Sequence, residues 1–118
     1  MKRRIFGMIF TAAISAYFMP SIALAGEHLL ESISHTKEAI EHGRADHADL
    51  LIMDADEGLK HAEAAEKEKA NSNVKSNSLI KEGIKHLKAS IDEGKKQDVK
   101  AATGHAEEAL TQLEAATK

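Results

Sequence analysis

The feature that most restricts the fold is an internal repeat, in which residues 51 positions apart match over much of the chain. Each copy has a segment with apolar residues at helical spacing, then a glycine, then a second such segment. The matched pairs are His35 and His86, Ile40 and Ile91, Gly43 and Gly94, Asp54 and His105, Ala55 and Ala106, and Leu59 and Leu110. Glycine is the residue that most easily adopts the left-handed conformation after a helix, so we predict Gly43 and Gly94 at the C′ position. The repeat therefore predicts two helix–Gly–helix hairpins.

Four segments carry a narrow apolar stripe, with one apolar residue every three or four positions, as amphipathic helices do. They cover about 28–42, about 47–69, a third that ends near 93, and about 98–116, with 70–73 as the central loop. Asp46 is the predicted N-cap of the second helix, and Asn73, Ser76 or Asn77 could cap the third.

Two such hairpins bury their stripes best against each other. We therefore predict an all-α fold, an antiparallel up-and-down four-helix bundle. The competing architecture is an extended two-helix coiled coil that dimerises, against which the two glycines argue. Gly58, inside the second helix, is expected to permit close helix approach. The residues expected to be buried are Ile33, Ile40, Leu51, Leu59, Ile84, Leu87, Ile91 and Leu110, and all seven histidines are expected to be substantially exposed.

Residues 1–25 have the pattern of a secretory signal peptide. Lys2, Arg3 and Arg4 precede an apolar run, and Ala23-Leu24-Ala25 is a small-x-small cleavage site before Gly26. A retained membrane anchor is the less favoured interpretation, because the run is short and Pro20 interrupts it. We expect an exported domain of residues 26–118, free of the membrane after cleavage and monomeric.

Composition after residue 25 excludes several classes of protein. The segment 26–118 has no aromatic residue, no Pro and no Cys, and it carries 13 basic against 19 acidic residues. The excess of acid argues against nucleic acid and anionic membranes and favours a cation or a basic partner. Without Cys the chain cannot form disulfides, thiolate zinc sites, iron–sulfur clusters or thioether-bound haem.

The histidines are the candidate ligands. In a helix over 27–42, His28, His35 and His42 form one stripe, roughly opposite the apolar stripe, with Glu31 and Glu38 beside it. Neighbours three or four residues apart can share a cation, because imidazole and carboxylate both bind divalent first-row metals. His47, His61, His86 and His105 complete the predicted site set. The alternative is that these residues are simply a solvated helix face.

The ligand types favour Cu(II), Ni(II) and Zn(II) over Cu(I), with Cu(II) first in the affinity order. Exposed pairs leave coordination positions to water, which predicts several exchangeable sites. The sequence carries no sign of an enzyme. Di-iron bundles need Glu-x-x-His pairs, and no histidine here has Glu three residues before it. His-Glu-x-x-His, Gly-rich phosphate loops and a Gly-x-Ser-x-Gly elbow are also absent from the sequence.

The sequence resembles the small metal-binding protein family of ammonia-oxidising bacteria over essentially all of 26–118. The resemblance lies in three segments and one glycine: Ala39-Ile40-Glu41-His42-Gly43, Gly83-Ile84-Lys85-His86-Leu87, His105-Ala106-Glu107-Glu108-Ala109-Leu110, and Gly94. It implies a periplasmic four-helix bundle that binds several divalent metals through histidines, copper preferred, in metal buffering, scavenging or tolerance. This chain is poorer in His. Asp54, Asn77, Glu93 and Gln112 stand where the repeat could carry one, so fewer ions are expected, especially in the C-terminal half.

The sequence leaves two rival hypotheses open. The first is a periplasmic helical interaction or chaperone-like protein with incidental histidines, which an immobilised-nickel column would distinguish. The second is a pH-responsive surface, because imidazole changes its charge near neutral pH.

Overall fold

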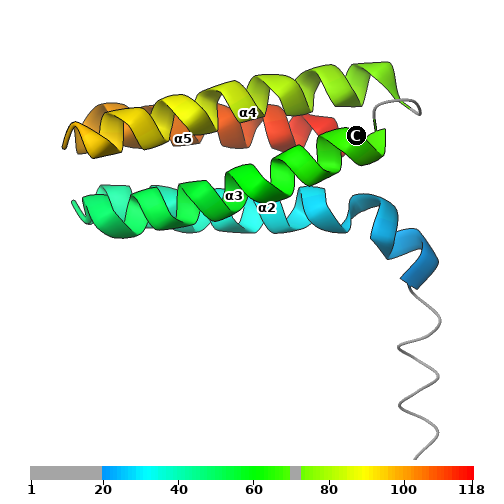
Figure 1. Cartoon of the computed structure of the whole chain (residues 1–118), viewed down its shortest axis with the longest axis horizontal. Helices are drawn as coiled ribbons and strands as arrows, with labels where there is room; N and C mark the ends of the chain where they lie inside the picture. The colour runs from blue at the N-terminus through cyan, green and yellow to red at the C-terminus, as the bar shows by residue number, and fades with distance from the viewer. Residues whose placement is uncertain (1–19, 70–72) are drawn as a thin grey trace, which may run out of the picture.

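The computed structural model describes residues 20–69 and 73–118, which form four helices. They are α2 (Pro20–Arg44), α3 (Ala48–Lys69), α4 (Val74–Lys95) and α5 (Val99–Ala116). Figure 1 shows α2 and α3 in one layer and α4 and α5 in the other, with each helix running back along the one before it. The helices contact one another in the cyclic order α2, α3, α4, α5. The predicted all-α four-helix bundle is confirmed.

Helices α4 and α5 each begin at a side-chain N-cap. Asn73 caps α4, since its side chain accepts a hydrogen bond from Ser76 N, and Asp98 caps α5 through Ala101 N. Of the three candidate caps for α4, Asn73 is thus the one used. Part of the predicted signal peptide, residues 1–19, and most of the predicted central loop, residues 70–72, lie outside the described residues. Among the helices described, none is long and apolar enough to cross a membrane.

The prediction that Gly43 and Gly94 end their helices in the left-handed conformation is wrong. No described glycine has a positive φ, and the left-handed residues are Asp46 (φ 64°) and Gln97 (φ 67°). The hydrogen bond from His47 N to His42 O and the one from Asp98 N to Glu93 O close the same turn in both hairpins. The predicted N-cap role of Asp46 is therefore also wrong, because this residue forms the turn and α3 begins two residues later.

The glycines are needed for packing between helices. A Cβ on Gly43 would lie 2.0 Å from Thr103 Oγ1 and 2.8 Å from Leu51 Cδ1. A Cβ on Gly94 would lie 2.8 Å from Ile52 Cγ1. Gly58 allows α2 and α3 to approach, as predicted, because its Cβ would meet Thr36 Oγ1 at 3.0 Å and Ser32 O at 3.4 Å.

The core follows the predicted apolar stripes with two exceptions. Leu59 and Leu110 pack against the core but are only partly buried. The six other predicted core residues are buried: Ile33, Ile40, Leu51, Ile84, Leu87 and Ile91. Because many other core positions are Ala, the helices lie close together and buried hydroxyls can reach across. Ser32 Oγ donates to Gly58 O at 2.7 Å and Ser90 Oγ to Ala102 O at 2.7 Å, which ties each hairpin together.

Candidate metal centre

Heptad stripes of α2 and α3 face each other across the first hairpin. The hairpin is antiparallel and its turn is short, so a residue a given distance before the turn meets one the same distance after it. The opposed pairs are His28 and His61, His35 and Asp54, and His42 and His47. The line along which two helices of a hairpin face each other is called its groove below, and in the first hairpin it carries histidines with a carboxylate at its centre.

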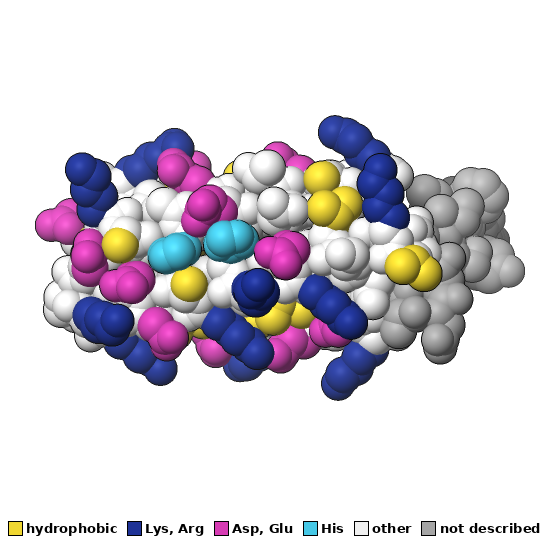
Figure 2. Space-filling model, turned by 90° about the horizontal axis from the view of Figure 1, so that it is seen from above, with side chains coloured by type: hydrophobic (Ala, Val, Ile, Leu, Met, Phe, Trp, Pro, Cys, Tyr) yellow, Lys and Arg dark blue, Asp and Glu magenta, His cyan; other side chains and the backbone are white. Residues whose placement is uncertain are grey.

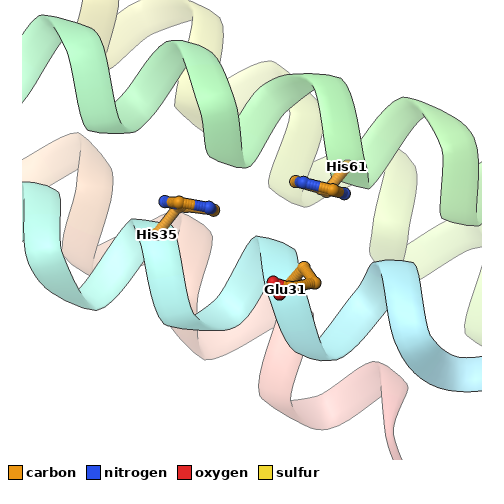
Figure 3. A group of neighbouring side chains, drawn as sticks. All are labelled: Glu31, His35 and His61. Atoms are coloured by element: carbon orange, nitrogen blue, oxygen red, sulfur yellow. The ribbon is translucent and has the colours of Figure 1, made fainter.

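The first group of candidate ligands is Glu31, His35 and His61, shown in Figure 3. One potential ligand atom from each of these residues lies within 4.8 Å of the other two. The rings of His35 and His61 stack with centroids 5.7 Å apart and planes at 5°. His28 extends the group, because its Nδ1 lies 3.0 Å from His61 Nδ1. Two helices thus contribute to this group, α2 from below and α3 from above in Figure 3.

The second group is His35, Glu38 and Asp54, again within 4.8 Å of one another. His35 Nδ1 lies 3.3 Å from Glu38 Oε1. Asp54 Oδ2 also lies 3.3 Å from His42 Nε2, so His42 adjoins the group from the next turn of α2. Asp54 was not in the predicted site set, although it shares a heptad stripe with His47 and His61, which was the signal that could have found it.

The third group is His86, His105 and Glu108, in the second hairpin. One carboxylate oxygen, Glu108 Oε1, lies 3.3 Å from His86 Nδ1 and 3.2 Å from His105 Nδ1. Figure 2 looks onto the α4 and α5 side of the bundle and shows two adjacent histidines with acidic side chains on either side of them. Glu108 was also absent from the predicted set, and its place three residues after His105 was the available signal.

The histidines do not form the fully outward face that the sequence predicted. Six of the seven are half-buried and only His47 is exposed, although none is buried in the core. The direction toward a neighbouring helix lies between the core and the solvent, and the histidine stripes point that way. Every group has ligands from two helices. The prediction that neighbouring ligands on one helix face share a cation therefore left out the ligands on the opposing helix. His47 lies 6.2 Å from His42, ring to ring, and outside all three groups.

The donor sets fit a cation. Nδ1 of His35 and of His105 is buried and makes no hydrogen bond. Each lies near a carboxylate oxygen, at 3.3 Å and 3.2 Å, but not in hydrogen-bonding geometry. An unsatisfied buried nitrogen costs free energy unless a partner arrives. A divalent ion would supply that partner to the ring nitrogen and to the carboxylate beside it.

The carboxylates of the groups are not neutralised by basic side chains. Over the residues that the structure describes, no Lys or Arg forms an ion pair with Glu31, Glu38, Asp54 or Glu108. Surface carboxylates elsewhere do have such partners, for example Glu107 with Arg44 and Glu93 with Lys96. The negative charge in the grooves is therefore available to a cation.

Comparison with known proteins agrees with this chemistry. A model of the family described as small metal-binding protein matches residues 2–116, nearly the whole chain. A search of curated proteins found no match. The resemblance inferred from the sequence is thus confirmed, and the chain belongs to the small metal-binding protein family.

Proposed function

We propose that this chain is an exported, non-catalytic protein that binds divalent metal ions in the grooves of its two hairpins and buffers them in the periplasm. Export is supported by the basic and apolar N-terminal segment with its small-x-small site before Gly26. The observation that carries the proposal is that histidines from paired helices meet carboxylates that have no Lys or Arg partner in the described chain.

Cu(II) is the ion that these ligands favour. Imidazole nitrogen and carboxylate oxygen suit Cu(II), Ni(II) and Zn(II), and Cu(II) stands highest among divalent ions in the affinity order. Cu(I) would need soft sulfur ligands. Met53 is the one thioether after residue 25, its exposed fraction is 55%, and it belongs to none of the three groups.

The open position of the groups suits buffering better than permanent storage. The side chains of His35 and His86 keep 28% and 27% of their surface exposed. Three protein ligands beside open solvent leave coordination positions to water, so an ion can be exchanged with another binder. A closed site with four protein ligands would hold its ion as a structural element instead.

The first hairpin holds the tightest site under this proposal, because it has two of the three groups and five of the seven histidines. Isothermal titration of the full chain with Cu(II), Ni(II) and Zn(II) tests the proposal. We expect the double substitution His35→Ala and His42→Ala to weaken the tightest Cu(II) step at least about tenfold, or about 1.4 kcal/mol. The pair His86→Ala and His105→Ala should leave that step intact and weaken a later one.

His47→Ala is the matched control, since it removes a histidine that lies outside all three groups. It should bind as the unsubstituted chain does. A chain that binds no ion, or binds equally well after both double substitutions, would refute metal binding in the grooves. The histidines would then be incidental, as in the rival hypothesis of a helical interaction protein.

A further inference from the structure

One residue belongs to two groups at once. Among the described residues, His35 is the only member shared between candidate metal groups, with Glu31 and His61 on one side and Glu38 and Asp54 on the other. Each of the other members belongs to one group. The two groups therefore occupy successive turns of the same groove and meet at a single imidazole ring.

An imidazole ring can bind two ions, because its two nitrogens point away from each other on the ring edge. His35 Nδ1 is the nitrogen beside Glu38 Oε1, at 3.3 Å, and it is buried without a hydrogen bond. That assigns Nδ1 to the group with Asp54 and leaves Nε2 for the group with Glu31 and His61. Figure 3 shows the His35 ring edge-on, with one nitrogen at the end nearer His61 and the other at the far end.

We propose that His35 bridges two divalent metal ions, one held with Glu31 and His61 and the other with Glu38 and Asp54. The proposal rests on the proposed function, because it concerns how ions share the first hairpin. It implies that the two ions bind as a coupled pair rather than as independent occupants.

The charges of the groove match such a pair. A neutral imidazole carries one N–H, and binding of the second ion displaces that proton to solvent and leaves an imidazolate. The imidazolate and the carboxylates of Glu31, Glu38 and Asp54 together carry four negative charges, which equal the charge of two divalent ions. None of these carboxylates has a Lys or Arg partner in the part of the chain that the structure describes.

The second hairpin supplies the comparison. His86 is the repeat counterpart of His35, but Ala89 stands where Glu38 stands in the first hairpin and Gln112 where His61 stands. His86 accordingly belongs to one group only, with His105 and Glu108. The side chains of His35 and His86 are similarly exposed, 28% and 27%. The main difference between them is that His35 belongs to two candidate metal groups and His86 to one.

The test uses the full chain loaded with Cu(II), with bound ions counted by native mass spectrometry and unpaired spins by electron paramagnetic resonance. A bridged Cu(II) pair is magnetically coupled, so fewer spins than copper ions should be detected. We expect His35→Ala to weaken two Cu(II) steps at least about tenfold each and to restore one spin per bound ion. His61→Ala and Asp54→Asn should each weaken one step and also restore the spin count.

His86→Ala is the matched control, and it should weaken one step and leave the spin deficit unchanged. The bridge is refuted if the loaded chain has one spin per copper ion. It is also refuted if His35→Ala weakens only one binding step, because that result means that the two groups compete for a single ion. A chain that binds no Cu(II) at all refutes the proposed function instead, so the two failures are distinguishable. Circular dichroism of each variant checks that the helices remain.

Discussion

The substitution Gly43→Ala tests the finding that this glycine serves helix packing rather than a turn. Gly43 is helical, so Ala would gain up to about 1 kcal/mol of helix propensity in a helix interior, and less here at the end of α2. Against this, the new Cβ would lie 2.0 Å from Thr103 Oγ1 on α5 and 2.8 Å from Leu51 Cδ1 on α3. Overpacking of this kind typically costs about 1–3 kcal/mol.

Two neighbours on different helices must move, so we expect a net loss of about 1–2 kcal/mol. For a domain of about this size each kcal/mol lowers the melting temperature by about 4–8 °C. Thermal unfolding followed by circular dichroism should therefore show a melting temperature about 5–10 °C lower.

The control is Gly104→Ala, at a helical position inside α5 where the new Cβ would meet nothing within 4 Å. Here only the propensity gain remains, so the melting temperature should rise. Adding Thr103→Ala to Gly43→Ala should recover part of the loss, because it removes the nearest clashing atom. If Gly43→Ala raises the melting temperature as much as Gly104→Ala does, the close contact of α2 with α5 is wrong.

Three further predictions can be checked with the same preparations. Ile84→Ala should lower the free energy of unfolding in urea by about 2–4 kcal/mol, because Ile84 is 93% buried between helices. An unchanged unfolding midpoint would mean that Ile84 does not lie in the core. Asp98→Ala should cost about 1 kcal/mol, since it removes the cap on Ala101 N at 3.1 Å, whereas Asp98→Asn should cost little. Lowering the pH from 7 to 5 should weaken Cu(II) binding in titration calorimetry, because protons compete with the metal for the ring nitrogens. The variant lacking His86 and His105 should lose fewer bound ions over this range. An affinity that does not change with pH would exclude histidine ligation.

Local rules were sufficient for the elements of this protein. Apolar residues at helical spacing placed all four helices, and Asn73 was among the three candidate caps of α4 because capping depends on a few neighbouring backbone groups. The last helix was predicted to begin near residue 98, and the structure shows that Asp98 caps it. The same rules failed at Gly43 and Gly94. A glycine near a helix end usually marks the left-handed residue, but here the reason for glycine is a side chain on another helix, Thr103 in one case and Ile52 in the other.

The candidate metal groups show the same division. Sequence spacing identified the histidines, and it placed His35 beside Glu38 because residues three apart are neighbours on a helix. It did not bring His35 to Asp54 and His61, or His86 to His105, since those distances depend on the antiparallel register of each hairpin and on the approach allowed by small residues such as Gly58. The sequence by itself determined the helices, the core stripes and the ligand types. Only the tertiary structure decided which ligands meet, because a site built between helices is set by packing and not by spacing along one chain segment.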